Sequence, residues 1–244
     1  MPEGPSIVIL REAAAPFAWR AVVRVEGNSR LDIGRMRGRR VKAFRSWGKH
    51  FLICFSGYTL RVHFMLFGTY RINERRETTP RLALGFRSGE LNFYACSLKF
   101  IEEDVDAVYD WRADVMGDAW DPRAARRKLA LQPRTLVADA LLDQSIFAGV
   151  GNIIKNEVLF RVRVHPQTRV GDLPSRKLGE LVRAARDYSF DFYRWKKAFV
   201  LKQHWQVHAR TVCPRCGRRL MFRASLGTSK RRAFYCVNCQ VRYG

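Results

Sequence analysis

Acidic residues are scarce in this chain, most of all near its end. The 244 residues include 22 Asp plus Glu against 45 Lys plus Arg, a formal net charge of +23 at pH 7. From Phe192 to Gly244 there are 13 Lys or Arg and no acidic residue. This excess predicts a polyanionic partner, and nucleic acid fits best because its dense phosphates reward distributed cations through counterion release. A merely solvated charged face is the alternative.

Long apolar runs are also missing. The candidate near the start, Ile7 to Leu10, has only four apolar residues before Arg11 and Glu12. That is too short for a membrane span or a secretory signal, so we expect no membrane partner. The chain is still 47% apolar, enough to bury a core, and its length suits two modest domains.

Cysteine is rare outside the C-terminal tail. Cys54 and Cys96 stand alone in expected strands, unlike the framework of a secreted disulfide-rich domain. The tail carries CPRC and CVNC with 19 residues between them. Two such knuckles bring four thiolates to one tetrahedral ion and leave no position for water, which predicts one structural Zn²⁺ per chain. Disulfides or unligated thiols are the alternatives to these ligands: Cys213, Cys216, Cys236 and Cys239.

The hairpin between the two knuckles carries a basic cluster. Metal binding would make it rigid and present Lys230, Arg231 and Arg232 on a fixed loop. The planar guanidinium of arginine suits bidentate contact with phosphate. A solvated basic tip is the alternative.

Short strand-like segments dominate the first half of the chain. A short helix is expected from Pro5, ended by Pro16. Turns at Gly48-Lys49 and Ser88-Gly89 predict hairpins. The rhythm is typical of an antiparallel sandwich or barrel. Its expected strands lie around 21–25, 40–45, 51–55, 59–64, 68–72, 81–86 and 91–95.

The second half changes to a helical period after a break rich in Gly, Pro and acidic residues. We therefore predict an α+β chain with an N-terminal helix plus antiparallel β-sandwich over 1–110. A linker over 111–121, a helical domain over 122–209 and a Cys₄ zinc finger over 210–244 complete the expected organisation.

The stretch LLDQSIFAGVGNIIKNEVLF contains a candidate anion site. Gly149 and Gly151 flank a sharp turn, and Asn152 then opens a helix. Backbone N–H groups at a helix start can hold a phosphate. A capped turn between packed helices is the alternative.

Four separated segments agree with one known family: PEGP at the start, the GK turn, LLDQ with AGVGN and a following E and HP, and the terminal Cys hairpin. The sequence resembles the formamidopyrimidine-DNA glycosylase and endonuclease VIII family over nearly its whole length. The resemblance implies a β-sandwich domain followed by a helix-two-turns-helix domain with a zinc finger. It also implies excision of oxidised bases from DNA, followed by strand cleavage at the abasic site.

The resemblance assigns the catalytic roles. Once Met1 is removed, the amine of Pro2 would attack the sugar C1′ and form an iminium. An α-amino group with a pKa near 7.8 is uncharged in roughly one molecule in seven at pH 7, which makes a chain terminus a ready nucleophile. Glu3 would act as general acid and base, and Lys49 would contact the lesion strand and aid base release.

The resemblance also assigns DNA contacts. Asn152 and Arg231 would grip phosphates around the flipped nucleotide. Met65, Leu66 and Phe67 would fill the gap it leaves, the alternative being a strand in the core. The finger loop, with 19 residues between Cys216 and Cys236, is about three residues longer than the resemblance leads us to expect. Arg232 or Lys230 could therefore take the role of Arg231.

Two departures favour the endonuclease VIII-like branch and oxidised pyrimidines. A DPRRFG-like stretch typical of the purine-directed branch is absent, its region reading YACSLKFIEED, and Ala138 stands where that branch tends to have lysine. We therefore expect a bifunctional DNA glycosylase and abasic-site lyase of base excision repair, a monomer, intracellular and associated with damaged DNA. The alternative is a noncatalytic nucleic-acid-binding zinc-ribbon protein.

Overall fold

The structure is a computed structural model that describes residues 2–244. The chain forms two units, of which the first ends at Asp110 and the second is Trp111–Gly244. Among the described residues, no helix is both long and apolar enough to cross a bilayer.

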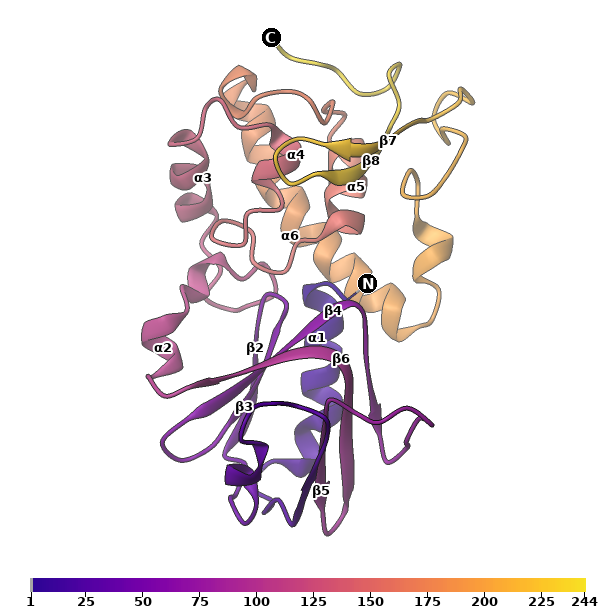
Figure 1. Ribbon diagram of the computed structural model, residues 1–244. Coiled ribbons are helices and arrows are strands. Elements are labelled where there is room, and N and C mark those ends of the chain that lie inside the picture. Colours follow the sequence, from indigo (N-terminus) through magenta and orange to yellow (C-terminus); the bar gives the residue numbers. More distant parts are fainter. Residues whose placement is uncertain (1) are drawn as a thin grey trace. The chain divides into compact units, whose positions relative to one another are not determined.

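Helix α1 (Gly4–Ala14) opens the first unit. Pro5 lies in its first turn, where the missing N–H costs no helical hydrogen bond. Ile7, Leu10 and Ala14 are buried and turn one face of the helix to the core, and the following 3₁₀ turn contains Pro16. The expected N-terminal helix is thus confirmed, and it lies against β2 and β3 (Figure 1).

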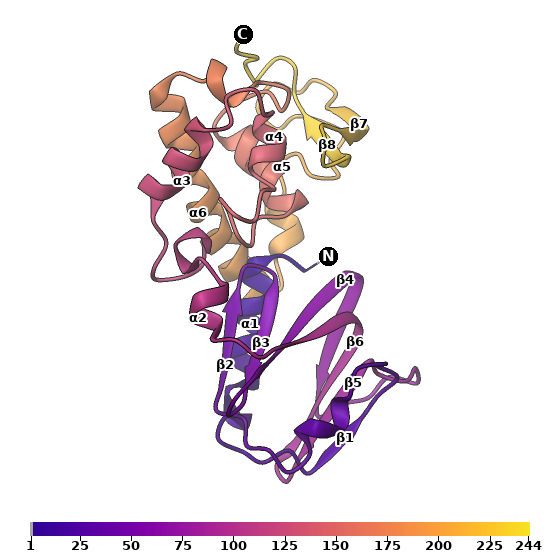
Figure 2. The ribbon, with the colours of Figure 1, turned by 60° about the vertical axis from the view of Figure 1, so that its left-hand side comes forward.

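One antiparallel sheet of six strands makes up most of this unit, in the order β1-β5-β6-β4-β3-β2 (Figure 2). Its core gathers the inward side chains of α1 and the sheet, among them Phe51, Leu60 and Phe93. The hairpin at Gly48-Lys49 is confirmed, and the other forms one residue earlier than expected, over Arg87-Ser88. The strands are β1 (Arg24–Glu26), β2 (Ala43–Trp47), β3 (His50–Cys54), β4 (Thr59–Ile72), β5 (Leu82–Phe86) and β6 (Gly89–Ile101); the short helix α2 (Val105–Val108) follows.

Strand β4 differs from the sequence expectation. Segments 59–64 and 68–72 were expected as separate strands, but they belong to one strand of 14 residues. Pairing with β6 jumps from Phe64↔Cys96 to Thr69↔Tyr94, so four residues of β4 oppose Ala95 alone. A Cβ on Gly68 would lie 2.7 Å from the Ala95 carbonyl oxygen, so only glycine fits this close approach. The segment expected as a loop is therefore a bulge of four residues within a continuous strand.

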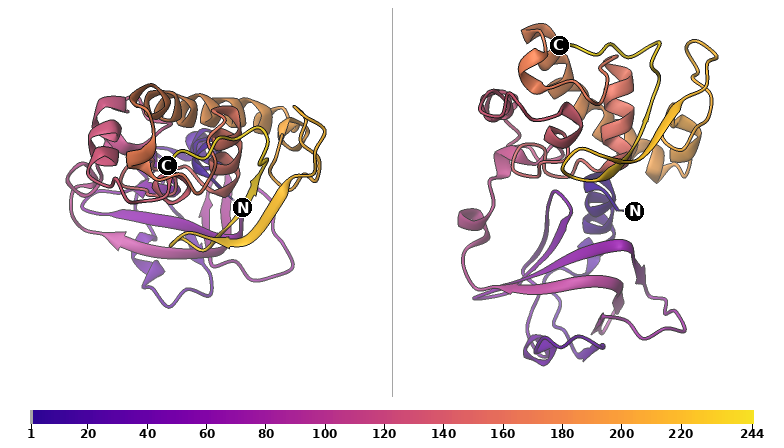
Figure 3. Two further views of the ribbon diagram at one scale, coloured as in Figure 1. Left: turned by 90° about the horizontal axis from the view of Figure 1, so that it is seen from above. Right: turned by 45° about the horizontal axis from the view of Figure 1, so that its top comes forward.

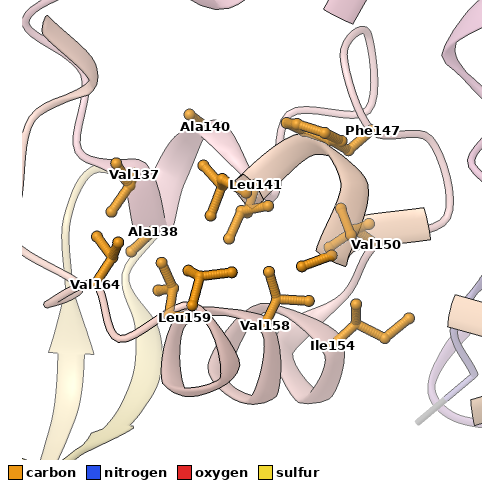
Figure 4. Packing of buried hydrophobic residues seen from close by; sticks show 14 of the residues in the cluster. Val137, Ala138, Ala140, Leu141, Phe147, Val150, Ile154, Val158, Leu159 and Val164 are labelled. Atoms are coloured by element: carbon orange, nitrogen blue, oxygen red, sulfur yellow. The ribbon is translucent and has the colours of Figure 1, made fainter. Parts of the chain in front are cut away.

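The second unit is mainly helical, as the change in period predicts. Its helices are α3 (Pro122–Ala130), α4 (Val137–Ala140), α5 (Asn152–Arg161) and α6 (Ser175–Lys197). The segment before α5 is mostly turn, because the carboxylate of Asp143 accepts the backbone N–H of Ser145 at 2.8 Å. Figure 4 shows how Val137 of α4 and Leu141, the residue that follows this helix, face Val158 and Leu159 of α5 across an apolar core.

The hairpin of β7 (Met221–Leu226) and β8 (Arg231–Tyr235) belongs to the same unit. Figure 3 shows it in yellow, and β8 contacts α5. Ala233 and Tyr235 of β8 are buried in the core of the helices. The hairpin between the cysteine knuckles is therefore part of the helical unit's core.

Candidate nucleic-acid interface and metal centre

The start of α1 places Pro2 and Glu3 at a helix N-terminus. Pro2 is half-buried, and the side chain of Glu3 is fully buried. The carbonyl oxygen of Glu3 accepts the N–H of Ser6 at 2.8 Å, which fixes its backbone as the N-cap, while its carboxylate makes no capping bond. The carboxylate is therefore buried at the start of the helix, beside the residue that precedes it. Met1 lies outside the described residues.

Lys49 lies in the tight turn between β2 and β3. Gly48 has φ of 53°, in the left-handed region that glycine adopts readily, and Trp47 pairs with His50 across the turn. The Nδ1 atom of His63, on β4, lies 3.2 Å from the carbonyl oxygen of Lys49. The turn is thus tied to the strand that leads into the bulge.

The two imidazoles beside Lys49 are uncharged at neutral pH. Burial lowers the pKa of His50 to about 3 and also lowers the pKa of His63. His50 Nδ1 lies 3.1 Å from the hydroxyl of Tyr109, and its ring packs on Trp47 and His63. A neutral aromatic cluster therefore supports the turn that carries the Lys49 ammonium.

The bulge of β4 exposes three consecutive large apolar side chains. Met65 is 55% exposed, Leu66 53% and Phe67 81%. The strand on either side is paired with β6, so the exposed residues stand on a fixed base. These exposures exclude the alternative that this segment is a strand buried in the core. The three side chains instead form an exposed apolar protrusion.

Asn152 is placed differently from the expectation of an open anion site. It is the first residue of α5 and is only 5% exposed. Its Oδ1 atom accepts a hydrogen bond from Nζ of Lys155 at 2.9 Å, and Lys155 is 1% exposed. Its side-chain carbonyl is thus already bonded within the unit, whereas Arg231 on the finger is exposed.

The sequence interpretation missed the structural roles of two polar residues that follow in α5. Asn156 Oδ1 accepts the N–H of Phe234 at 3.2 Å, which joins the helix to the finger. Glu157 accepts the N–H groups of residues 206–208 at 2.7 to 3.1 Å. Burial raises the pKa of Glu157, and the three amides act against that rise. The available signal was KNE, three polar residues in succession within an otherwise apolar helix.

The four tail cysteines converge on one point. Their sulfur atoms all lie within 4.8 Å of one another. The Sγ atoms of Cys213 and Cys239 are 3.8 Å apart, and those of Cys216 and Cys236 are 3.6 Å apart. Tetrahedral Zn²⁺ with Zn–S bonds of about 2.3 Å requires S···S separations of about 3.8 Å. The cluster can therefore hold a metal ion, and its dimensions fit four thiolates around one tetrahedral centre.

Two side chains fasten the knuckles to the helices. Nη1 of Arg215 donates to the carbonyl oxygen of Phe160 at 2.7 Å, at the last turn of α5, where a cation is favoured by the helix dipole. Gln240 is 4% exposed; it accepts the N–H of Cys236 at 2.9 Å and donates to the carbonyl oxygen of Val164 at 2.8 Å. The metal centre is thus continuous with the helical unit.

Comparison with known proteins places this geometry in a family. The formamidopyrimidine-DNA glycosylase N-terminal domain matches residues 1–100, and the H2TH domain of the same enzymes matches residues 113–188. The chain is 30% identical over 261 residues to the DNA-(apurinic or apyrimidinic site) lyase Nei2 of Mycolicibacterium smegmatis, covering 99% of each chain. The chain belongs to the formamidopyrimidine-DNA glycosylase family, in its endonuclease VIII-like branch.

Other members of this glycosylase family share the sequence or the fold. Endonuclease 8-like 3 of Xenopus laevis is 28% identical over 252 residues, which are 98% of this chain but 40% of that protein. The chain spans only 33–40% of the length of the endonuclease 8-like 3 relatives from four vertebrate species. The formamidopyrimidine-DNA glycosylase of Lactococcus lactis, solved bound to abasic-site DNA, superposes with a TM-score of 0.85 at 19% identity, covering 98% of this chain and all of that one.

Proposed function

We propose that this chain is a bifunctional DNA glycosylase and abasic-site lyase that removes oxidised bases, principally pyrimidines. The observation that carries the proposal is the pairing of Pro2 with the wholly buried Glu3 at the start of α1. A protein that only binds DNA has no need of the secondary amine that Pro2 offers once Met1 is removed, next to the buried carboxyl group of Glu3. The relative Nei2, which is named a DNA-(apurinic or apyrimidinic site) lyase, supports the proposal because the match covers 99% of both chains.

The chemistry follows from the secondary amine of Pro2 that removal of Met1 would release, in its unprotonated form. Its lone pair forms a bond to C1′ while the C1′–base bond breaks, and the base leaves with that electron pair and a proton. Protonation of the ring oxygen O4′ by Glu3 then breaks the C1′–O4′ bond and leaves an iminium between Pro2 and C1′. The iminium acidifies C2′, so loss of a C2′ proton to the Glu3 carboxylate breaks the C3′–O bond by elimination, with the phosphate as leaving group. The adjacent position of the two residues keeps the base close to the covalent intermediate.

The remaining residues divide the task of holding DNA. Lys49 contacts the lesion strand, and Met65, Leu66 and Phe67 fill the stack after the nucleotide is flipped out. Asn152 and Arg231 contact phosphates, and a Zn²⁺ ion held by the four cysteines keeps the finger folded. The unit up to residue 110 carries the chemistry, 122–209 binds DNA, and 210–244 is the finger, with 111–121 as the connection.

Borohydride trapping tests the proposal. With duplex DNA containing an oxidised pyrimidine, the protein should form a covalent adduct, because borohydride reduces the iminium to a stable amine. Pro2→Gly should abolish or greatly reduce the adduct, while Pro16→Ala, which changes a proline on the exposed 3₁₀ turn, should leave it intact. A wild-type protein that binds the duplex but never cross-links would establish the noncatalytic alternative.

A lesion panel decides the branch-specific part. Duplexes carrying one oxidised pyrimidine or one oxidised purine are compared under single-turnover conditions. Faster release of the pyrimidine is expected, and faster release of the purine would contradict the substrate preference while leaving the lyase chemistry in place. Because damaged DNA is the proposed substrate, the protein is expected to work inside the cell wherever DNA lies.

A further inference from the structure

A buried carboxylate in the helices holds the tip of the finger. Asp139 of α4 is 9% exposed. Its Oδ2 atom accepts the backbone N–H of Thr228 at 3.0 Å, and its Oδ1 atom accepts that of Ser229 at 3.0 Å. Both oxygens are thus used by neighbouring amides of one turn, 89 and 90 residues away in the sequence. Hydrogen bonds to a charged carboxylate are stronger than neutral ones, so this contact restrains the turn.

The turn is shaped around this carboxylate. Gly227 has φ of +69°, and a Cβ placed on it would lie 2.1 Å from Oδ2 of Asp139. Any other residue would both strain the backbone and displace the carboxylate. The tip of the finger loop is therefore held by a specific contact with α4.

A second anchor holds the finger on the far side of its basic cluster. Nζ of Lys155 donates to the carbonyl oxygen of Arg232 at 2.8 Å and to Oδ1 of Asn152 at 2.9 Å. Asn156 adds its bond to the N–H of Phe234. One buried ammonium therefore joins the finger backbone directly to the side chain that opens α5.

The exposed cations lie between the two anchors. Lys230 and Arg231 follow the amides bound by Asp139 and precede the carbonyl bound by Lys155. Their side chains are exposed, while their backbone is restrained from both ends. Prior restraint lowers the conformational entropy that a side chain loses on binding, so a fixed arginine binds phosphate more tightly than the same arginine on a loose loop.

We propose that Asp139 and Lys155 are positioning residues that hold Arg231 in register with Asn152, so that both address the phosphates of one DNA strand. The inference rests on the proposed function for its ligand. Neither Asp139 nor Lys155 touches DNA in this arrangement; each acts through the finger backbone. The register is thereby built from α4 and α5 as well as from the metal knuckles.

A double-mutant cycle tests the inference. Binding to a duplex with a stable abasic-site analogue is measured against salt for the wild type, Arg231→Ala, Asp139→Ala and the double variant. In the wild-type background, Arg231→Ala should weaken binding on the order of 10-fold and lower the salt slope by about 0.9, the loss of one phosphate contact. In the Asp139→Ala background, the same change should weaken binding less than about 2-fold, since the arginine is already out of register.

Equal effects of Arg231→Ala in both backgrounds would overturn the inference. Asp139→Asn, which keeps the shape and loses charge, should give an intermediate coupling, and it serves as the second variant if Asp139→Ala loses its metal or fold. Asp187→Asn, which changes an exposed carboxylate on α6, is the matched control and should leave the full effect of Arg231→Ala. Zinc content and circular dichroism should be unchanged in every variant that enters the cycle.

The same experiment on Lys155 tests the second anchor. Lys155→Arg retains the charge and should preserve much of the coupling, whereas Lys155→Met should abolish the dependence of binding on Arg231. Failure of the enzyme assignment appears separately, as absent borohydride trapping by the wild type. Coupling without trapping would keep the positioning role in a DNA-binding protein, and trapping without coupling would remove the positioning role alone.

Discussion

Nδ1 of His63 lies 3.2 Å from the carbonyl oxygen of Lys49. This contact ties the turn that presents the candidate lesion-strand lysine to the strand that carries the apolar bulge. Because burial lowers the pKa of His63, the ring is neutral at pH 7 and its Nδ1–H can donate to that carbonyl.

Replacing His63 should therefore loosen the turn without removing the Lys49 charge. His63→Phe keeps a ring but loses the donor, at a cost of about 1 kcal/mol for one hydrogen bond. We expect borohydride trapping to slow by roughly 3- to 10-fold, because raising a barrier by about 1 kcal/mol slows a reaction about 5-fold. His63→Asn, which retains a donor, should recover part of the rate, and an unchanged rate in His63→Phe would show that the turn needs no such support.

The bulge residues should matter for duplex DNA and little for stability. Phe67 is 81% exposed, so Phe67→Ala should change the free energy of unfolding by less than about 0.5 kcal/mol. Loss of the wedge should nevertheless reduce flipping in a duplex on the order of 10-fold, because unstacking costs a few kcal/mol. A fluorescent base analogue opposite the lesion reports the flipping.

Phe199→Ala provides the comparison for this variant. Phe199 is 95% exposed but belongs to the second unit and not to the bulge of β4, and its removal should leave flipping unchanged. A single-stranded abasic substrate needs no wedge and should be cleaved equally by Phe67→Ala. A large loss on that substrate would contradict the wedge role.

Metal removal should act on one unit only. Zn²⁺ binding contributes about 10–16 kcal/mol to the folding of small zinc sites, so a chelator or Cys216→Ser should unfold the finger hairpin. Hydrogen exchange should then show lost protection in β7 and β8 and in the amides of residues 206–208, with β3 and β6 unaffected. DNA affinity should fall with the finger, and a protein that stays protected after complete zinc loss would contradict a structural metal.

The histidine beside Lys49 sets a pH dependence of stability. The pKa of His50 is lowered to about 3 from an ordinary 6.5. Between these values the unfolded chain takes up a proton that the folded chain does not, so stability is lost as the pH falls from 6.5 towards 3. One proton contributes at most about 1.4 kcal/mol per pH unit.

His50→Gln should remove this part of the pH dependence. Hydrogen exchange at β3 in urea, compared at pH 7, 5.5 and 4.5, measures the stability of the first unit by itself. The wild type should lose protection more steeply than His50→Gln as the pH falls. Parallel curves for the two proteins would show that the proton uptake belongs to other groups.

Local chemistry was sufficient to predict some elements and insufficient for others. The Gly48-Lys49 turn and the paired cysteine knuckles depend on residues close in sequence, and both form as expected. The fusion of 59–64 with 68–72 into β4 was missed because pairing with β6 on both sides of the bulge outweighs the local break.

The buried polar contacts were beyond prediction for the same reason. Nothing near Asp139 indicates that it binds amides 89 residues later, and Asn152 looked open because its cover, Lys155, binds a carbonyl 77 residues away. Such contacts depend on how the finger packs against α4 and α5. They explain why the sequence identified candidate DNA ligands more readily than the residues that orient them.

The mismatch in β4, where four residues oppose Ala95, has a further consequence. Pairing resumes on both sides of this stretch, and of its four residues only Gly68 is held to one residue type by a close approach. The exposed side chains of Met65, Leu66 and Phe67 can therefore change without shifting the rest of the sheet. Substitutions at these three positions are therefore tolerated by the fold. The shape of the proposed wedge can thus differ between related chains while α1 and the Gly48-Lys49 turn stay unchanged.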